Sequence, residues 1–257
     1  MASLDNAQIR SGTYRSTLGR LALAQKPGRG APPYSRWVNR RVGRWLAAAA
    51  YLARLTPNQV TMLSALTTLA ALVLVAAVPP SWWLGPLVAF LLLLAYALDA
   101  ADGQLARLTG GGSKAGEWLD HVVDAAKIGL MHTAVLVSFS AYSGERELGI
   151  LLVPVGFMVV SFVFFFGMIL TEQLKRAAAA EAGERYVKPS GGGGTLQTLV
   201  AIPTDYAVLC LSFVLLGAHE LFLLVYLILF VAQGLVLLAV LVRWWLQLRG
   251  IDRDGLR

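Results

Sequence analysis

Residues 99–124 read DAADGQLARLTGGGSKAGEWLDHVVD, and four of these residues are aspartates. Apolar stretches long enough to cross a membrane flank this segment on both sides. A charged carboxylate in or near a bilayer costs several kcal/mol unless it faces a wet cavity, a charged partner or a metal ion. We therefore expect the four aspartates to form a site for polyvalent cations inside a membrane protein.

The composition is that of a membrane protein. Hydrophobic residues make up 57% of the 257 residues and charged residues 14%, and the mean hydropathy is +0.63. These values exclude an ordinary soluble domain and predict an all-α polytopic membrane protein. The single cysteine, Cys210, lies in an apolar run, so we expect a small buried side chain and no disulfide or thiolate metal site.

The apolar stretches predict six transmembrane helices, which together form one domain over residues 55–247. Thr56 is a natural N-cap for the first of them, and Pro57 suits the first helical position. A cytoplasmic tail over residues 248–257 follows the last helix. The six predicted spans cover residues 58–78, 82–99, 117–141, 148–171, 199–217 and 220–246.

Basic residues are concentrated in alternate loops. Ten of the 22 lysines and arginines precede the first predicted span, and four more close the chain. The opposite set of loops holds one basic residue, Arg146. The positive-inside rule therefore predicts that both termini and the aspartate segment lie on the cytoplasmic face.

Two different segments precede the first span. Residues 1–32 are polar and basic, and we expect them to be flexible and, without the apolar core of a signal peptide, uncleaved. Residues 33–54 combine arginines at four-residue spacing (Arg36, Arg40 and Arg44) with tryptophans and aliphatic residues. This pattern predicts an N-terminal amphipathic interfacial helix that binds anionic lipid. The alternative is a basic flank that only sets the topology.

The spacing of the aspartates predicts their arrangement. Asp99 and Asp102 share a face at the end of one helix, and Asp120 and Asp124 share a face at the start of the next. A glycine-rich reversal joins the two helices, so the two pairs can face each other across a gap. Such a cluster suits Mg²⁺ or Mn²⁺, which take oxygen ligands and leave positions open for phosphate. Two such ions would polarise a phosphoryl group and stabilise a leaving oxyanion.

Other residues in this segment fit a phosphate site. Gly103 and Gly116 would let a ligand approach the backbone, although a glycine in a membrane helix is commonly a packing residue. Arg107 can bind phosphate bidentately or act as a topology anchor. Lys127, one turn beyond Asp124, either compensates the carboxylate charge or extends elsewhere.

The spacing D-x₂-D-G-x₂-A-R-x₈-G-x₃-D-x₃-D, from Asp99 to Asp124, resembles the complete signature of the CDP-alcohol phosphotransferases. Residues 55–61 (LTPNQVT) also resemble this family's entry to its first membrane helix. The six spans and the interfacial helix extend the resemblance to residues 33–247. It implies an integral membrane enzyme that works at the cytoplasmic interface and is commonly a homodimer, with no nucleic acid among its partners.

The resemblance also implies roles for individual residues. The four aspartates Asp99, Asp102, Asp120 and Asp124 would hold two Mg²⁺ or Mn²⁺ ions. Asp124 would also act as general base on the acceptor hydroxyl, which attacks the β-phosphorus of a CDP-linked donor and releases CMP. The residues implied to contact the nucleotide are Asn58, Thr61, Gly103, Ala106, Arg107, Ser113 and Gly116.

The acceptor alcohol is less defined. A basic loop after the fourth span could hold the phosphate of a polyol-phosphate acceptor, or only anchor the topology. Asp205 could bind acceptor hydroxyls or cap the helix that follows it. The four basic residues are Lys175, Arg176, Arg185 and Lys188.

Several functional alternatives remain open at this point. A lipid donor, CDP-diacylglycerol, fits a site at the membrane interface, but a soluble CDP-alcohol donor with a lipid acceptor uses the same signature. An intramembrane prenyltransferase also uses two aspartate clusters, though with a different spacing. A cation-coupled transporter would place carboxylates near mid-membrane in broken helices.

Overall fold

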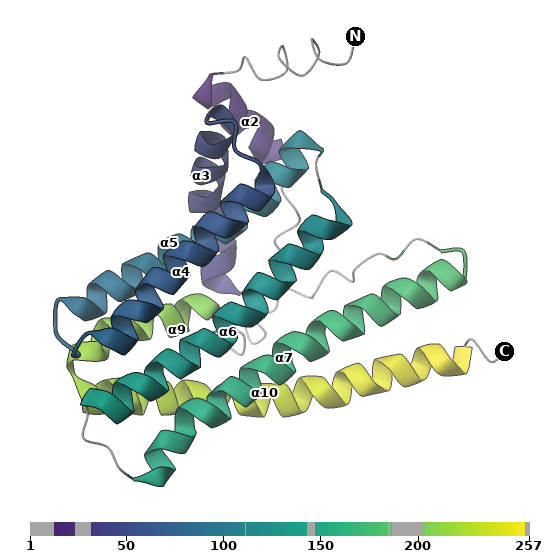
Figure 1. The fold of residues 1–257 in the computed structure, drawn as a ribbon. Helices are drawn as coiled ribbons and strands as arrows, with labels where there is room; N and C mark the ends of the chain where they lie inside the picture. Colours follow the sequence, from purple (N-terminus) through teal and green to yellow (C-terminus); the bar gives the residue numbers. More distant parts are fainter. Residues whose placement is uncertain are drawn as a thin grey trace.

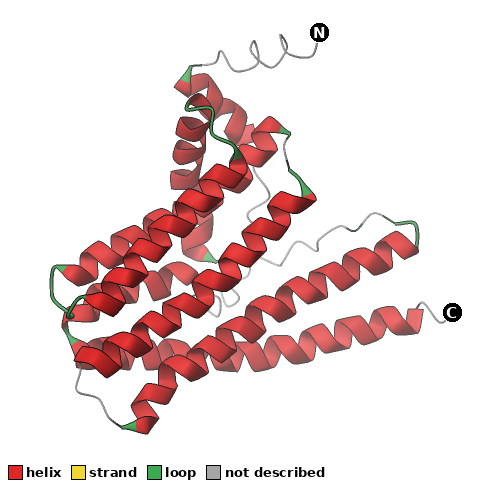
Figure 2. Cartoon of the chain, in the orientation of Figure 1, coloured by secondary structure: helices red, strands yellow, loops and turns green. Residues whose placement is uncertain are grey.

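The computed structural model describes residues 13–23, 32–110, 112–142, 147–184, 186, 202 and 204–254. Every regular element in these ranges is helical (Figure 2). In chain order the elements are α2 (Tyr14–Leu23), the π-helical turn η1 (Ser35–Asn39), α3 (Arg40–Leu52), α4 (Pro57–Ala77), α5 (Leu84–Thr109), α6 (Lys114–Tyr142), α7 (Leu148–Glu181), α9 (Tyr206–Ser212), the 3₁₀ helix η2 (Phe213–Gly217) and α10 (His219–Asp254).

Five helices, α4, α5, α6, α7 and α10, are long and apolar enough to cross a membrane. The sixth predicted span, 199–217, corresponds to a shorter apolar helix over Tyr206–Gly217, and part of its N-terminal side lies outside the described residues. The prediction of an all-α polytopic membrane protein is confirmed. Helices α5 and α7 also continue well past the predicted span ends at residues 99 and 171. Each helix therefore includes polar residues beyond the predicted apolar span.

The helices alternate in direction (Figure 1). The α4–α5 connection, the end of α6 and the start of α7 lie at one end of the bundle. The end of α5 and the start of α6 lie toward the other, where α7 and α10 also end. Gly110 makes the α5–α6 reversal possible, because it takes the left-handed conformation (φ 62°) at the C-cap of α5. The aspartate segment is thus folded back on itself between two antiparallel neighbours.

The central core is apolar and includes side chains from all five long helices and from η2. Leu92 on α5, Val135 on α6, Phe157 on α7 and Phe213 on η2 are all at most 1% exposed. A small polar group lies within this core, where His132 contacts the Tyr226 hydroxyl through Nδ1 and the Ser161 hydroxyl through Nε2. Because both ring nitrogens have hydrogen-bond partners, burial of this histidine needs no ligand to explain it.

The first membrane helix begins where the sequence predicts. The Thr56 hydroxyl accepts from the Gln59 backbone N–H at 3.3 Å, and Gln59 Oε1 accepts from the Thr56 N–H at 2.8 Å. This reciprocal pair is a capping box, and Pro57 occupies the first helical position. The cap fixes the end of α4 that lies beside the aspartates.

The structure corrects the expectation of a flexible segment over residues 1–32 for Tyr14–Leu23, which form helix α2. Its Leu21 is 1% exposed, the Tyr14 hydroxyl donates to the Trp45 carbonyl at 3.1 Å, and Arg20 lies over the Tyr51 ring. Contacts with α3 therefore stabilise a helix whose sequence alone gives only a weak helical pattern.

Helix α3 has the two faces expected of an interfacial helix. Trp45 is 55% exposed, whereas Ala47 and Ala48 are fully buried. Gly43 lets α3 approach α5 closely, because a Cβ there would lie 3.0 Å from the Ala100 Cβ. This packing brings the start of α3 beside the aspartate segment, and binding of α3 to anionic lipid stays a prediction.

Candidate active site

Three of the four aspartates meet at one point. Asp99 comes from α5, and Asp120 and Asp124 come from α6; one carboxylate oxygen from each lies within 4.8 Å of the others. The three side chains are half-buried. The antiparallel arrangement of α5 and α6 thus brings together residues that are 21 or more positions apart in the sequence.

The fourth aspartate, Asp102, lies beside this cluster and is held by a different helix. It is 7% exposed, and its Oδ2 accepts a hydrogen bond from the Thr61 hydroxyl of α4 at 2.6 Å. Thr61, which the resemblance assigns to the nucleotide, here orients a carboxylate. Asp102 still lines the same cavity as Asp99 and Asp120.

Lys127 links the two helices of the cluster. Its Nζ donates to Asp99 Oδ1 at 2.6 Å and to Asp124 Oδ1 at 3.1 Å, and its side chain is only 11% exposed. Of the two roles considered for Lys127, the structure supports charge compensation. The carboxylates are therefore already arranged around a shared cation.

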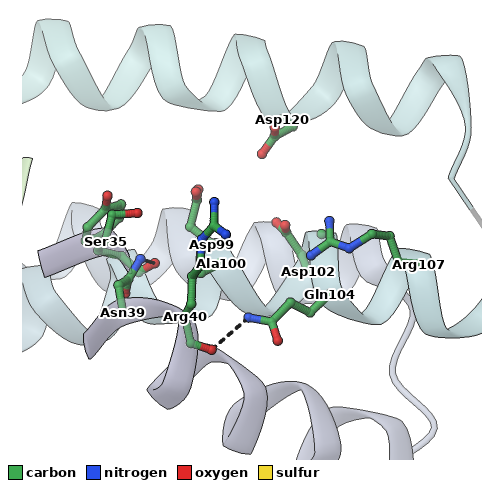
Figure 3. Close-up of a pocket in the computed structure, with 11 residues that line it drawn as sticks. Ser35, Asn39, Arg40, Asp99, Ala100, Asp102, Gln104, Arg107 and Asp120 are labelled. Atoms are coloured by element: carbon green, nitrogen blue, oxygen red, sulfur yellow. Dashed lines mark hydrogen bonds between the residues drawn. The ribbon is translucent and has the colours of Figure 1, made fainter. Parts of the chain in front are cut away.

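A cavity of about 270 Å³ opens beside the cluster (Figure 3). Asp99, Asp102, Gly103 and Arg107 of α5 line it, with Asp120 of α6 opposite. Arg107 folds back over Gly103, where an added Cβ would lie 3.4 Å from Arg107 Nη1. Carboxylates and a guanidinium thus border one space, which suits a phosphate ligand bound together with cations.

The remaining residues of the predicted nucleotide set lie nearby, where α4 and α6 begin. The Gly116 N–H donates to the Ser113 hydroxyl at 3.0 Å. A Cβ on Gly116 would lie 3.2 Å from both the Ser113 hydroxyl and Asn58 Oδ1, so these three residues are grouped. Ala106 is half-buried on α5, next to Arg107, and does not line the cavity.

The predicted acceptor residues are dispersed. Arg176 pairs with Glu117 of α6 and Glu172 of α7, both at 2.9 Å, and Lys175 donates to Gln247 of α10. These contacts connect helices at the end where α7 and α10 stop, and they leave an acceptor role as a prediction. Arg185 and Lys188 lie outside the described residues.

Asp205 is engaged in structural contacts. It is 2% exposed and caps α9, since Oδ1 accepts from the Ala207 N–H at 3.2 Å. Its Oδ2 accepts from the Tyr34 N–H at 3.0 Å, which attaches the start of the interfacial segment to α9. The capping role is therefore supported, and binding of acceptor hydroxyls by Asp205 stays untested.

Divalent ions fit the chemistry of the cluster. Its ligand atoms are hard carboxylate oxygens close enough to share an ion, and the site already accommodates the ammonium group of Lys127. Asp99, Asp120 and Asp124 would hold Mg²⁺ or Mn²⁺, with Asp102 beside them.

One wall of the cavity consists of residues that the sequence did not mark as part of the site. Asn39 and Arg40, from η1 and α3, line it together with Tyr96 and Gln104 of α5. The four-residue periodicity placed Arg40 on one lipid-facing stripe with Arg36. The π-helical turn at Ser35–Asn39 changes the helical register, and π turns are frequent at functional sites. No local signal in the sequence predicts this turn.

Known proteins resemble this chain in sequence and in fold. The archaetidylinositol phosphate synthase of Aeropyrum pernix is 30% identical over 145 residues, which are 53% of this chain and 72% of that protein. The structure of Mycobacterium tuberculosis phosphatidylinositol phosphate synthase (PgsA1) with CDP-DAG bound shares the fold, with a TM-score of 0.51 and 22% identity. That match covers 81% of this chain and 94% of the other.

The family model for CDP-alcohol phosphatidyltransferase matches residues 54–245, which is well over half of the chain. The match includes the whole aspartate signature and all the long membrane helices up to the last turns of α10. It decides against the prenyltransferase and transporter alternatives. The chain belongs to the CDP-alcohol phosphatidyltransferase family and is a membrane transferase of substituted phosphate groups.

Proposed function

We propose that this enzyme transfers a phosphatidyl group from CDP-diacylglycerol to an alcohol and releases CMP. One observation carries the proposal: the carboxylates of Asp99, Asp120 and Asp124 converge beside a cavity that Arg107 also lines. The solved relative that contains CDP-DAG supports the choice of donor, since it shares this fold over nearly its whole length.

The proposed reaction begins at Asp124. Its carboxylate accepts the proton of the acceptor hydroxyl, whose oxygen forms a bond to the β-phosphorus of the donor. The bond between that phosphorus and the bridging oxygen breaks, and CMP leaves with the electron pair. When bound, Mg²⁺ or Mn²⁺ would supply positive charge that polarises the phosphoryl group and stabilises the leaving oxyanion.

Neighbouring residues hold the reacting groups in position. The ammonium group of Lys127 contacts both Asp99 and Asp124 and so fixes the distance between α5 and α6 at the cluster. The Thr61 hydroxyl orients Asp102. Because proximity and orientation can lower the barrier of such a transfer, we expect these supporting contacts to contribute to the rate.

We also propose a membrane topology, an oligomeric state and an acceptor for this enzyme. Both termini and the active site lie on the cytoplasmic face, which the distribution of basic residues supports. The enzyme acts as a homodimer in phospholipid biosynthesis, as its family resemblance implies. The acceptor is a phosphorylated polyol, because the similar proteins are named as synthases of inositol phosphate lipids.

Arg107→Lys is expected to raise the KM for the CDP-linked donor by about tenfold, the scale of one charge-assisted hydrogen bond. Lysine keeps the positive charge but lacks the planar fork that binds phosphate bidentately. Steady-state kinetics with the donor varied would measure this change. Arg54→Lys, an exposed arginine before α4, is the matched control. Wild-type kinetics for Arg107→Lys would mean that Arg107 does not bind phosphate bidentately and acts as a topology anchor.

The test of the proposed reaction is a substrate screen. Purified protein is incubated with CDP-diacylglycerol and a panel of polyols and polyol phosphates, and in a second arm with soluble CDP-alcohols and diacylglycerol. CMP release and the lipid product are measured by mass spectrometry. We expect a product only in the first arm, with a polyol phosphate as acceptor. A product only in the second arm would reverse the roles of donor and acceptor.

A further inference from the structure

The wall of the cavity that η1 and α3 contribute has no role in the reaction described above. Figure 3 shows Asn39 and Arg40 across the cavity from Asp120, and the side chain of Gln104 extends from α5 to Arg40. Gln104 Nε2 donates to the Arg40 carbonyl at 3.1 Å, which fixes the start of α3 to α5. This wall is therefore a built part of the active-site cavity.

Asn39 presents a buried hydrogen-bond acceptor without a partner. The residue is 3% exposed, and its Nδ2 donates to the Tyr96 carbonyl at 3.2 Å, which fixes the orientation of the amide. Its Oδ1 has no hydrogen-bond partner among the described residues. A buried acceptor left in this state costs free energy, so a bound molecule that donates a hydrogen bond would be favoured here.

Arg40 follows directly and differs from its neighbours. It is half-buried and lines the cavity, whereas Arg36 and Arg41 on the same segment are exposed. Arg40 and Arg107 line the same cavity, and the charge of Arg107 is influenced by both Arg40 and Asp102. Two guanidinium groups at one cavity can bind phosphate oxygens together, because the guanidinium fork matches their geometry.

We infer that Asn39 and Arg40 form a subsite for a phosphate group that has a hydroxyl next to it. Arg40, together with Arg107, binds the phosphate, and Asn39 Oδ1 accepts the hydrogen bond of the hydroxyl. This inference rests on the proposed function. Two parts of the substrates carry this chemistry: the diphosphate and ribose of the CDP-linked donor, and the phosphate and hydroxyls of a polyol-phosphate acceptor.

The test compares Arg40→Gln with Arg41→Gln, which removes the same charge from an exposed position one residue away. Calorimetry on the purified full chain with Mg²⁺ measures the binding of CDP, and the binding of inorganic phosphate to protein saturated with CMP. We expect Arg40→Gln to weaken one of these affinities by about tenfold or more, and Arg41→Gln to leave both unchanged. Weaker CDP binding assigns the subsite to the donor, and weaker phosphate binding assigns it to the acceptor.

Two further variants separate binding from structure. Arg40→Lys keeps the charge and should lose part of the affinity, because the bidentate geometry is lost. Asn39→Leu should lower the affinity for the same ligand whose binding Arg40→Gln weakens. Thermal unfolding of each variant reports any loss of fold independently.

Binding needs no turnover, so the outcome is independent of the proposed reaction. A chain that binds CDP through Arg40 but releases no CMP from any CDP-linked donor would retain the subsite and lose the proposed function. Unchanged CDP affinity in Arg40→Gln, together with unchanged or absent phosphate binding, would overturn the subsite. Equal losses in Arg40→Gln and Arg41→Gln would overturn it as well, because both would then act through overall charge.

Discussion

Asp124→Asn is expected to lower kcat by about 10²–10⁴-fold, the range that a lost general base produces. Asparagine has nearly the same shape and can still accept a hydrogen bond from Lys127, but it cannot take the proton of the acceptor hydroxyl. Binding of CDP should change little, because Asp99 and Asp120 remain. Rates of CMP release, together with calorimetry of CDP binding, would measure the two effects separately.

Asp99→Asn and Asp102→Asn provide the contrast. Both should weaken metal-dependent CDP binding itself, since they remove charge from the site that holds the cations and the diphosphate. Asp252→Asn, at an exposed position on α10, is the control and should match the wild type. If Asp124→Asn and Asp99→Asn lose CDP affinity equally, Asp124 is a ligand like the others and the general base lies elsewhere.

Lys127→Met should destabilise the protein by about 3–5 kcal/mol when divalent ions are absent, the scale for removing one partner of a buried ion pair. The reason is that Asp99 and Asp124 would face each other without the ammonium group that now lies 2.6 and 3.1 Å from their oxygens. Added Mg²⁺ should recover part of the loss, because it would replace the missing positive charge and bind only the folded state. Unfolding of detergent-solubilised protein in EDTA and in Mg²⁺ would show both effects.

Lys114→Met is the matched control for this experiment. Lys114 lies on the same helix, α6, but is exposed, so its replacement should change stability by less than about 0.5 kcal/mol. Equal stability of Lys127→Met and the wild type in EDTA would mean that the lysine is not needed to hold the carboxylates together.

Much of the site follows from local spacing. Four-residue spacing places Asp120 and Asp124 on one face of a helix, and a glycine-rich reversal makes the preceding helix antiparallel, so their meeting with Asp99 is predictable. The orientation of Asp102 cannot be predicted in this way, because it depends on the packing of Thr61 from α4 against α5. A contact between residues 41 positions apart has no local signal in the sequence.

The less predictable elements also depend on tertiary contacts. Helix α2 forms where residues such as Leu21 pack against α3, although its sequence reads as a polar tail. Arg40 reaches the cavity because the π-helical turn before it alters the register that the arginine spacing implied. Asp205 illustrates a residue for which both alternatives were visible in the sequence, and only its two backbone partners favour the capping role.

The aspartate cluster is proposed to perform a metal-dependent transfer from a CDP-linked lipid. The most direct measurement is CMP release from CDP-diacylglycerol by the purified enzyme in Mg²⁺, in excess EDTA, and after Mg²⁺ or Mn²⁺ is added back. Turnover should stop in EDTA and return with either ion, and Asp99→Asn should remain inactive throughout. Full turnover in excess EDTA would contradict the claim.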